Sequence, residues 1–257
     1  MSMDDPRFGG FSSLEVADDG MSFVATSDRG TLLLGDILRE NGRLTGVTNL
    51  RLIDILDSKG APLISYHVDA EGLAISETGE IFMSFEANHR VMVQTAPEAT
   101  PEFVPKHPDF RILQNNSGLE ALAIDQDGTL YGIPERSGAL ERPFPVYRFV
   151  NGAWDKDWSI LRIGKFLVTG ADIFEGQLYL LERSFTGLAG FSSRIRRFEI
   201  GVHSGDVLLE TTAGDFDNME GIAVWKRGDG AERVLMIADD NFFVLQRNQL
   251  VEFVLEE

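Results

Sequence analysis

The sequence predicts an all-β fold, a β-propeller of five four-stranded antiparallel blades. A short pattern recurs five times, at Leu14, Leu73, Leu122, Ala171 and Ile222. These positions lie about fifty residues apart, a period that is typical of propellers and solenoids. Within each repeat apolar residues alternate with period two, which indicates strands, and helical spacing is nearly absent. Four antiparallel strands repeated radially form a propeller, so the prediction is one blade for each repeat.

Each repeat divides into four predicted strands, taken here in chain order. Alternation sets the strands, and runs of turn residues set their ends. The predicted strands are 13–17, 22–27, 31–38 and 47–55 in unit one; 72–76, 81–86, 90–95 and 110–113 in unit two; 121–125, 130–134, 146–150 and 159–163 in unit three; 170–174, 177–182, 194–200 and 207–211 in unit four; and 221–225, 234–239, 242–246 and 250–255 in unit five.

The turns between the first two strands support this division. Gly20, Gly79, Gly128 and Gly176 stand where tight hairpin turns require a positive φ. Unit five replaces this turn with a longer loop, 226–233. The units fill the chain from residue 11 to residue 255, so residues 1–257 are predicted to form a single domain, with 1–8 as a flexible lead-in.

Six blades are the alternative to five. The interval between the first two repeats exceeds the others by only about ten residues, which is too few for a four-stranded blade. Two loops are also distinctive. Segment 96–109 holds four of the nine prolines and is expected to be extended. Segment 184–193 contains Gly187 and Gly190 and is either a lid or a plain surface loop.

Composition excludes several classes of function. The net charge is −18, and nucleic-acid binders and proteins of anionic membranes carry the opposite balance. Cysteine is absent, which excludes disulfides, thiolate metal sites and cysteine nucleophiles. No apolar run approaches the ~20 residues of a membrane span. Residues 1–10 do not read as a signal peptide, so a cytoplasmic protein and one whose leader has been removed both remain open. We expect a monomer.

Carboxylates at the ends of the first two strands predict the site. In an antiparallel hairpin the start of one strand lies beside the end of the next. Because the innermost strands converge on the central channel, the repeats predict a ring of about eight carboxylates around one channel mouth. The pairs are Glu71 with Glu86, Glu120 with Glu135, and Glu220 with Asp239 or Asp240, while units one and four supply only Asp28 and Glu182.

So many like charges need compensation. One source is arginine, since Arg29, Arg136 and Arg183 each directly follow a carboxylate of their unit. The other is a hard cation, for which Ca²⁺ suits a set of oxygen ligands. Such a metal is expected toward units two, three and five. Side-chain amides that could complete its shell are Asn88, Asn116, Asn218 and Asn241. Each carboxylate could instead simply tie neighbouring blades together.

Histidine contributes little to these predictions. The four histidines lack the spacing of a zinc site. His67 precedes the 69–71 segment closely enough to reach the rim and contact a substrate. The alternative is a hydrogen-bonded loop residue with no role in binding.

Several motifs together resemble a known family. They are Phe8-Gly-Gly-Phe-Ser-Ser-Leu14, Ser27-Asp-Arg29, Asp69-Ala-Glu71-Gly-Leu-Ala74, Glu182-Arg-Ser184, Met219-Glu-Gly-Ile-Ala223 and Asp239-Asp-Asn-Phe242. In this order they are similar to the phytase-like propeller family, which carries the description "esterase-like activity of phytase". The resemblance implies a propeller, export to the periplasm or medium of a bacterium, and hydrolysis of a phosphoester with the help of calcium.

The chain departs from the true propeller phytases, which have six blades and bind a highly anionic substrate. It has five repeats, and its predicted rim holds three arginines and few lysines. The predicted function is therefore hydrolysis of a small phosphoester or ester, with Ca²⁺ as the expected metal and Arg29, Arg136, Arg183, Asn241 and His67 as the expected substrate contacts. A non-catalytic binding propeller and a calcium-dependent lactonase are the alternatives.

Overall fold

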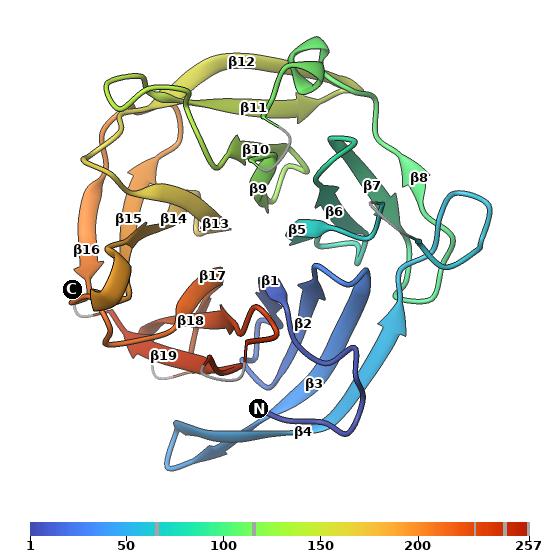
Figure 1. The fold of residues 1–257 in the computed structure, drawn as a ribbon, viewed down its shortest axis with the longest axis vertical. Helices are drawn as coiled ribbons and strands as arrows, with labels where there is room; N and C mark the ends of the chain where they lie inside the picture. Colours follow the sequence, from blue (N-terminus) through green and yellow to red (C-terminus); the bar gives the residue numbers. More distant parts are fainter. Residues whose placement is uncertain (65–66, 115–116, 229, 244–245, 256–257) are drawn as a thin grey trace.

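The fold is a ring of five antiparallel sheets around a central channel (Figure 1). The computed structural model describes residues 1–64, 67–114, 117–228, 230–243 and 246–255. The strands are β1 (Phe11–Val16), β2 (Ser22–Ser27), β3 (Thr31–Glu40), β4 (Arg43–Asp54), β5 (Ala70–Ile75), β6 (Ile81–Phe85), β7 (Arg90–Gln94), β8 (Glu102–Phe103), β9 (Leu119–Ile124), β10 (Leu130–Pro134), β11 (Phe144–Val150), β12 (Ala153–Ile160), β13 (Leu167–Phe174), β14 (Gln177–Phe185), β15 (Phe191–Glu199), β16 (Asp206–Glu210), β17 (Asn218–Lys226), β18 (Glu232–Asp239) and β19 (Leu250–Val254).

The prediction of an all-β, five-bladed propeller is confirmed, and the alternative of six blades is wrong. Each sheet is built from consecutive strands, in the orders β1-β2-β3-β4, β5-β6-β7-β8, β9-β10-β11-β12, β13-β14-β15-β16 and β17-β18-β19. The first strand of each blade lines the channel, and successive inner strands contact one another around the ring. The 3-10 helices η2 (Pro108–Arg111) and η3 (Gly187–Ala189) lie in the connections. Among the described residues no helix is long and apolar enough to cross a membrane.

The outer strands differ from the prediction in two blades. In the second blade the fourth strand is β8, inside the proline-rich segment, whereas the predicted strand 110–113 overlaps helix η2, which Pro108 begins. In the fifth blade β19 pairs directly with β18 and takes the third place, not the fourth. Within the predicted strand 242–246, Phe242 and Phe243 lie outside any strand and residues 244–245 lie outside the described residues.

Residues 1–8 and 184–193, the two segments that the sequence suggests are flexible, both make contacts in the structure. Phe8 is buried and its ring lies 5.1 Å from that of Phe11, and the amino group of Met1 donates to the Asn248 carbonyl at 2.6 Å. In segment 184–193, the β14–β15 ladder continues to the pair Phe185–Phe191, so that a hairpin replaces most of the predicted loop.

The apolar residues fill the spaces between blades, as the period-two pattern requires. Each face of a sheet packs on its neighbour, and separate clusters of buried side chains lie between adjacent blades. The ring closes where blade five meets blade one. There the Arg39 guanidinium donates to both oxygens of Glu252, at 2.8 and 2.6 Å, and lies 4.5 Å from the Trp225 ring. Both charged side chains are buried. The ion pair therefore links the first and fifth blades, whose described sheets share no strand.

The closure contact predicts the effect of one substitution. Arg39→Ala removes a buried, bidentate ion pair, and we expect the free energy of unfolding to fall by about 2–4 kcal/mol. Arg51→Ala is the matched control, because its partner Glu98 is exposed and the pair should contribute less than about 1 kcal/mol. Denaturant titration of both variants measures the difference, and equal losses would contradict the assigned role of Arg39.

Candidate functional site

A β-bulge recurs at the same place in all five blades. The ladder between the first two strands shifts register between Phe11 and Ser13, and at the corresponding point of every other inner strand. A bulge leaves one residue without a ladder partner and redirects its side chain. The five residues at the bulge form what we call the first ring: Ser12, Glu71, Glu120, Thr169 and Glu220.

A second ring follows from the same ladders. Each residue just before the bulge pairs with a residue near the end of the second strand, as Ala70 does with Phe85 and Val168 with Glu182. The residue after that partner stands at the mouth beside the bulge. The second ring is Asp28, Glu86, Glu135, Arg183 and Asp239. Four blades therefore supply a carboxylate at this position, and blade four supplies an arginine.

The two rings enclose a cavity of about 200 Å³ at the channel mouth. Its walls contain every member of both rings except Thr169, which is buried and whose hydroxyl lies 3.3 Å from the Met219 carbonyl. Asp69 and Asn241 complete the lining. Eight carboxylates and one arginine thus surround the cavity: Asp28, Asp69, Glu71, Glu86, Glu120, Glu135, Glu220, Asp239 and Arg183.

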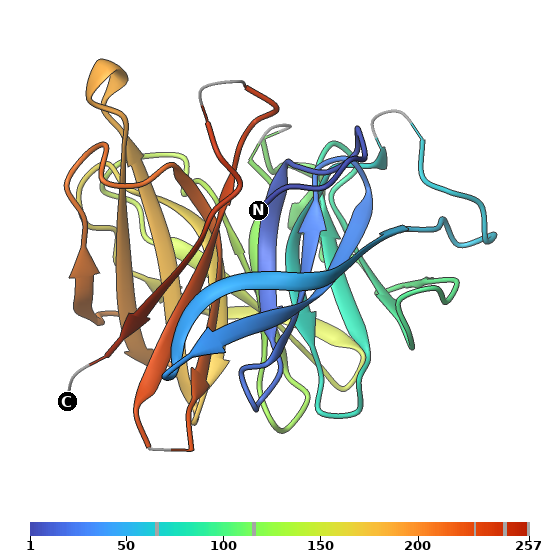
Figure 2. The same ribbon diagram turned by 90° about the horizontal axis from the view of Figure 1, so that it is seen from below.

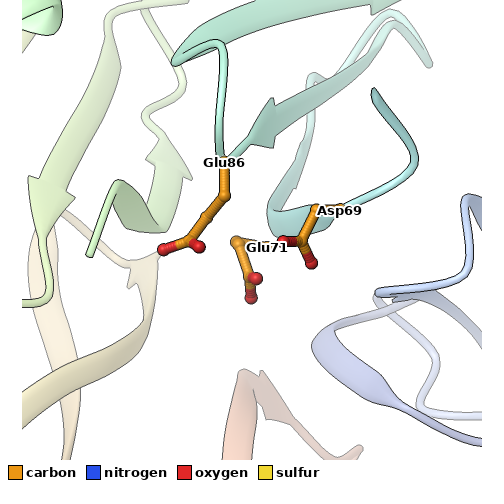
Figure 3. Close-up of side chains that lie close together, drawn as sticks. All are labelled: Asp69, Glu71 and Glu86. Carbon is orange, nitrogen blue, oxygen red and sulfur yellow. The ribbon is translucent and has the colours of Figure 1, made fainter. Parts of the chain in front are cut away.

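The carboxylates of the second blade form a compact group. Asp69 precedes β5, Glu71 lies at its bulge, and Glu86 follows β6, and one oxygen of each lies within 4.8 Å of the others. Figure 3 shows the three side chains close together, with Glu71 between Glu86 and Asp69. The backbone N–H of Gly118 donates to Glu86 at 3.0 Å. Asp28 borders this group from blade one, with one oxygen 3.7 Å from Arg29 Nε.

Arg183 occupies the opposite side of the mouth. Its guanidinium donates to Glu220 and to the side-chain oxygen of Asn218, and lies 3.4 Å from Glu135. Asn218 in turn donates to Glu220 at 2.6 Å and to Asp239 at 3.3 Å. Arg136 adds a bond of 2.9 Å to the other oxygen of Glu135. Glu135 of blade three and Glu220 of blade five are therefore paired with arginine, whereas among the described residues no arginine donates to a mouth carboxylate of blade two.

Burial raises the pKa of most of the lining carboxyls, and neighbouring like charges add to the effect. Burial, with the nearby charges of Glu120 and Glu220, raises the pKa of Glu71 well above its usual range. Burial and the hydrogen bond that Glu120 gives to Glu86 do the same to the pKa of Glu120. Burial raises the pKa of Asp28 to about 6, against the opposing charge of Arg29.

Two further lining carboxyls follow the same rule. Burial and the charge of Glu220 raise the pKa of Asp239 to about 7. Burial also raises the pKa of Asp69. The group at the mouth therefore retains protons at pH values where isolated carboxyls have lost them, unless a cation replaces them.

A second pair of buried carboxyls lies further down the inner strands. Glu15 and Asp172 occupy equivalent positions of blades one and four, where the other blades have alanine. Glu15 accepts a bond of 3.3 Å from the N–H of Ile75, and Asp172 accepts one of 2.5 Å from the N–H of Val224. Burial raises the pKa of both. These carboxyls tie adjacent inner strands together below the mouth.

Two residues expected in the ring lie elsewhere. Glu182 is fully buried inside blade four, where Arg194 donates to it at 2.8 Å and Arg196 at 3.3 Å. Glu182 comes one residue before the second-ring residue of its blade, Arg183. Because neighbouring side chains of a strand point to opposite faces, Glu182 points away from the mouth. Asp240 is one residue beyond the ring and accepts bonds from the N–H of Gly10 and from Asn248.

The other predicted contacts divide between the rim and the periphery. Arg29 and Arg136 are about half exposed and lie at the rim, beside Asp28 and Glu135. Asn241 lines the cavity. His67 is absent from the described lining, and its carbonyl accepts a bond from Arg90 at 2.6 Å. Asn88 accepts from Lys106, and Asn116 lies outside the described residues.

Comparison with known proteins decides the family. The model of the phytase-like family, described as having esterase-like activity of phytase, matches residues 6–242. The chain belongs to this family. The resemblance predicted from its motifs is thereby confirmed, and the match extends from the lead-in through the last residues of the phytase-like mouth. No curated protein matches the sequence significantly.

Solved structures similar to this phytase-like chain are distant in sequence. An exo-β-1,3-galactanase from Clostridium thermocellum has 13% identity and a TM-score of 0.58, over 89% of this chain and 57% of that one. A GH43 β-1,3-galactosidase has 9% identity and a TM-score of 0.55, over 97% and 91%. A Dyadobacter fermentans protein of unknown function has 11% identity and a TM-score of 0.50, over 97% and 84%. At such identities the likeness shows the propeller fold alone.

The residues of the mouth fit a calcium ion, the metal that the family implies. All donors of the Asp69–Glu71–Glu86 group are carboxylate oxygens, which Ca²⁺ prefers. One buried oxygen of Asp28 has no hydrogen-bond partner among the described residues. Gly10 leaves room for that oxygen, because a Cβ at this position would lie only 2.1 Å from it. The φ of Gly10, +63°, also lies in the region that favours glycine.

The raised pKa values predict an unusual dependence of stability on pH. A carboxyl whose folded-state pKa is raised holds a proton that the unfolded chain releases near pH 4. Its contribution is fully present below that pH and is lost as pH rises through the folded pKa, which is about 7 for Asp239. In EDTA we expect Asp239→Asn to flatten the fall in melting temperature between pH 4 and 7. Parallel profiles for both proteins would contradict this assignment.

Glu182 of blade four and Glu71 of blade two should respond oppositely when the charge of each is removed. Glu182→Gln removes the counter-charge of the buried Arg196 and leaves Arg194 with only Glu210, at 3.8 Å, so we expect a loss of roughly 3–5 kcal/mol in the free energy of unfolding. Glu71→Gln removes one of several crowded like charges, so we expect a gain on the order of 1 kcal/mol at pH 8 in EDTA. Calorimetry with and without calcium measures both, and addition of calcium should remove the advantage of Glu71→Gln.

Proposed function

We propose that the protein is a hydrolase of small anionic phosphoesters or esters that works at the channel mouth with a bound Ca²⁺. The observation that carries this proposal is the uncompensated carboxylate group of blade two facing the arginine of blade four across one small cavity. The carboxylates of blade two are placed to bind a cation, and the arginine of blade four is placed to bind an anion. The family membership supports hydrolysis as the reaction class. Export from a bacterial cell, also implied by the family, and a monomeric state remain predictions.

The metal side consists of Asp69, Glu71 and Glu86, with Asp28 beside them. A calcium ion held there would polarise a phosphoryl or carbonyl oxygen of the substrate and favour loss of a proton from water. The three side chains are fixed before binding, because Glu71 is set by its bulge and Glu86 accepts from Gly118. Pre-positioned ligands reduce the cost of ordering the site.

The anion side consists of Arg183, with Arg29 at the rim. Although burial alone would lower its pKa, the charges of Glu220 and Glu135 raise the pKa of Arg183, so it stays charged. A guanidinium can bind two oxygens of a phosphate or carboxylate at once. Because Glu220 and Asn218 hold the guanidinium in place, it would bind the substrate anion without first losing rotational freedom.

Two carboxyls could move protons in this reaction. Glu120 lies in the same cavity, and burial together with its hydrogen bond to Glu86 raises the pKa of Glu120 well above its usual range. A carboxyl with a raised pKa is suited to give a proton to a leaving-group oxygen. Asp239, with a pKa of about 7, is suited to accept a proton near neutral pH. Because Glu120 and Asp239 have different surroundings within one cavity, the first is suited to donate a proton and the second to accept one.

The two alternatives make different use of the same residues. In a non-catalytic binding propeller, Glu86 and Glu135 would serve only as ties between blades, and their bonds to Gly118 and Arg183 are consistent with that role. A calcium-dependent lactonase needs a Glu, Asn and Asp set, which Glu220, Asn218 and Asp239 provide. Arg183, however, already donates to two of these three side chains, which disfavours a metal there.

Calcium-dependent turnover tests the proposal. With p-nitrophenyl phosphate and p-nitrophenyl acetate as probes, we expect activity with calcium that EDTA abolishes. Glu71→Gln should reduce kcat/KM at least about 100-fold, since ligand or transition-state contacts of this kind are worth 10²–10³. Calorimetric titration with CaCl₂ should show one strong site in the native protein and none in Glu71→Gln.

The matched control is Glu98→Gln, an exposed carboxylate paired with Arg51 on the outside of the ring. This variant should keep both calcium binding and turnover. Absence of both in the unmodified protein would reject the hydrolase and leave the binding propeller, whereas turnover of lactones alone would indicate the lactonase.

A further inference from the structure

Exposed apolar side chains lie on two connections at the end of the ring that holds the acidic mouth. The tip of the β14–β15 hairpin carries Phe185, which is 64% exposed, and Leu188, which is fully exposed. Phe243, 55% exposed, stands on the neighbouring connection of blade five. Figure 2 shows the orange tip of this hairpin and the red connection of blade five both rising at the same end of the ring. We call Phe185, Leu188, Phe191, Phe242 and Phe243 the apolar rim.

The hairpin tip is continuous with the anion side of the site. Phe185 is two residues beyond Arg183 on β14, so both side chains project from the same face of the strand. The rings of Phe185 and Phe191 lie 4.9 Å apart, and the Arg183 guanidinium lies 5.8 Å from the Phe191 ring. Any anion bound by Arg183 therefore has aromatic surface directly beside it.

The same combination occurs on blade one. The Arg29 guanidinium lies 4.2 Å from the ring of Phe242, the residue after the lining Asn241. Phe242 also packs against the lead-in, because a Cβ on Gly10 would lie 2.7 Å from its ring. Arg183 and Arg29 thus both lie beside aromatic rings, and lysines are absent from the described lining of the mouth.

The size of the cavity sets where the rest of a ligand can lie. A volume of about 200 Å³ is below the ~300–1,000 Å³ of sites that enclose a whole drug-sized ligand. The polar cavity has room for an ester or phosphate group with its cation. A larger substituent must extend over the apolar rim, where burying it against Phe185 and Leu188 would be favourable.

From these contacts we infer that the substrates are monoesters that combine one anionic group with an apolar alkyl or aryl substituent. The anionic group enters the cavity between Arg183 and the carboxylate side, and the substituent lies on the apolar rim. This inference rests on the proposed function and narrows it, since a polyanion such as an inositol polyphosphate would bring charges against apolar side chains. Hydrolysis breaks the ester bond with water and releases an apolar alcohol and the anion.

An alkyl phosphate series tests the inference. Methyl, butyl and octyl phosphate have similar leaving groups, so differences in kcat/KM report the substituent. Below the concentrations that form micelles, we expect kcat/KM to rise roughly two- to fourfold per methylene that reaches the rim. Phe185→Ser and Leu188→Ser should flatten this rise and leave methyl phosphate unchanged. Val150→Ser is the control, since Val150 is a 41% exposed valine at the opposite end of blade three.

Binding of non-hydrolysable phosphonates separates this inference from the proposed reaction. In calcium, octylphosphonate should bind more tightly than methylphosphonate, and Leu188→Ser should remove the difference. Turnover without dependence on chain length would overturn the inference and leave the hydrolase. Tighter binding of octylphosphonate without turnover would support the inference and reject the hydrolase. Equal or absent binding of both phosphonates would overturn the inference.

Discussion

Repulsion among carboxylates at the channel mouth is the constraint on which the rest of the site depends. Two rings of side chains contain seven carboxylates and one arginine, and Asp69 adds an eighth negative group. Such a group cannot be fully ionised at neutral pH without cations. Arg183 meets this need for Glu135 and Glu220, and the carboxylates of blade two are left to protons or, in the proposed function, to a metal. The position of one arginine thus decides where a metal can bind.

The bulge explains how five unlike blades place their side chains at one mouth. A regular strand would alternate its side chains between the two faces of the sheet, and both faces are buried against neighbouring blades. The extra residue at the bulge escapes this alternation and turns toward the channel. The first ring is therefore available for polar side chains without disturbing the apolar packing, and Ser12 and Thr169 show that the position also accepts small residues.

Much of this arrangement could be predicted from the sequence, because the repeat fixes both the number of blades and the end at which the carboxylates lie. The errors come from single-residue register. Glu182 and Arg183 are adjacent, and only the ladder of β13 with β14 shows that Arg183 is the one equivalent to Glu86 and Glu135. The same holds for Asp239 and Asp240.

Outer strands were harder to predict than inner ones for a related reason. Inner strands are held by neighbours on both sides of the ring, whereas an outer strand has one partner and less apolar pattern. Segment 110–113 contains a buried Phe110, which gives it the composition of a strand, but Pro108 removes a backbone donor and begins a 3-10 helix instead. In blade five, β19 fills the third place, and no repeat-based argument distinguishes the third strand from the fourth.

Differences among the blades give the site a direction. With identical repeats the mouth would have fivefold symmetry, and a ligand could bind in five equivalent ways. Arginine in place of a carboxylate in blade four, serine in blade one and the aspartate before β5 in blade two each remove that symmetry. The aromatic residues of the rim lie beside the arginines of blades four and one, and the unpaired carboxylates lie on blade two. A ligand with one cation-binding end and one apolar end can therefore bind in only one orientation, which is the condition for a reaction at a single bond.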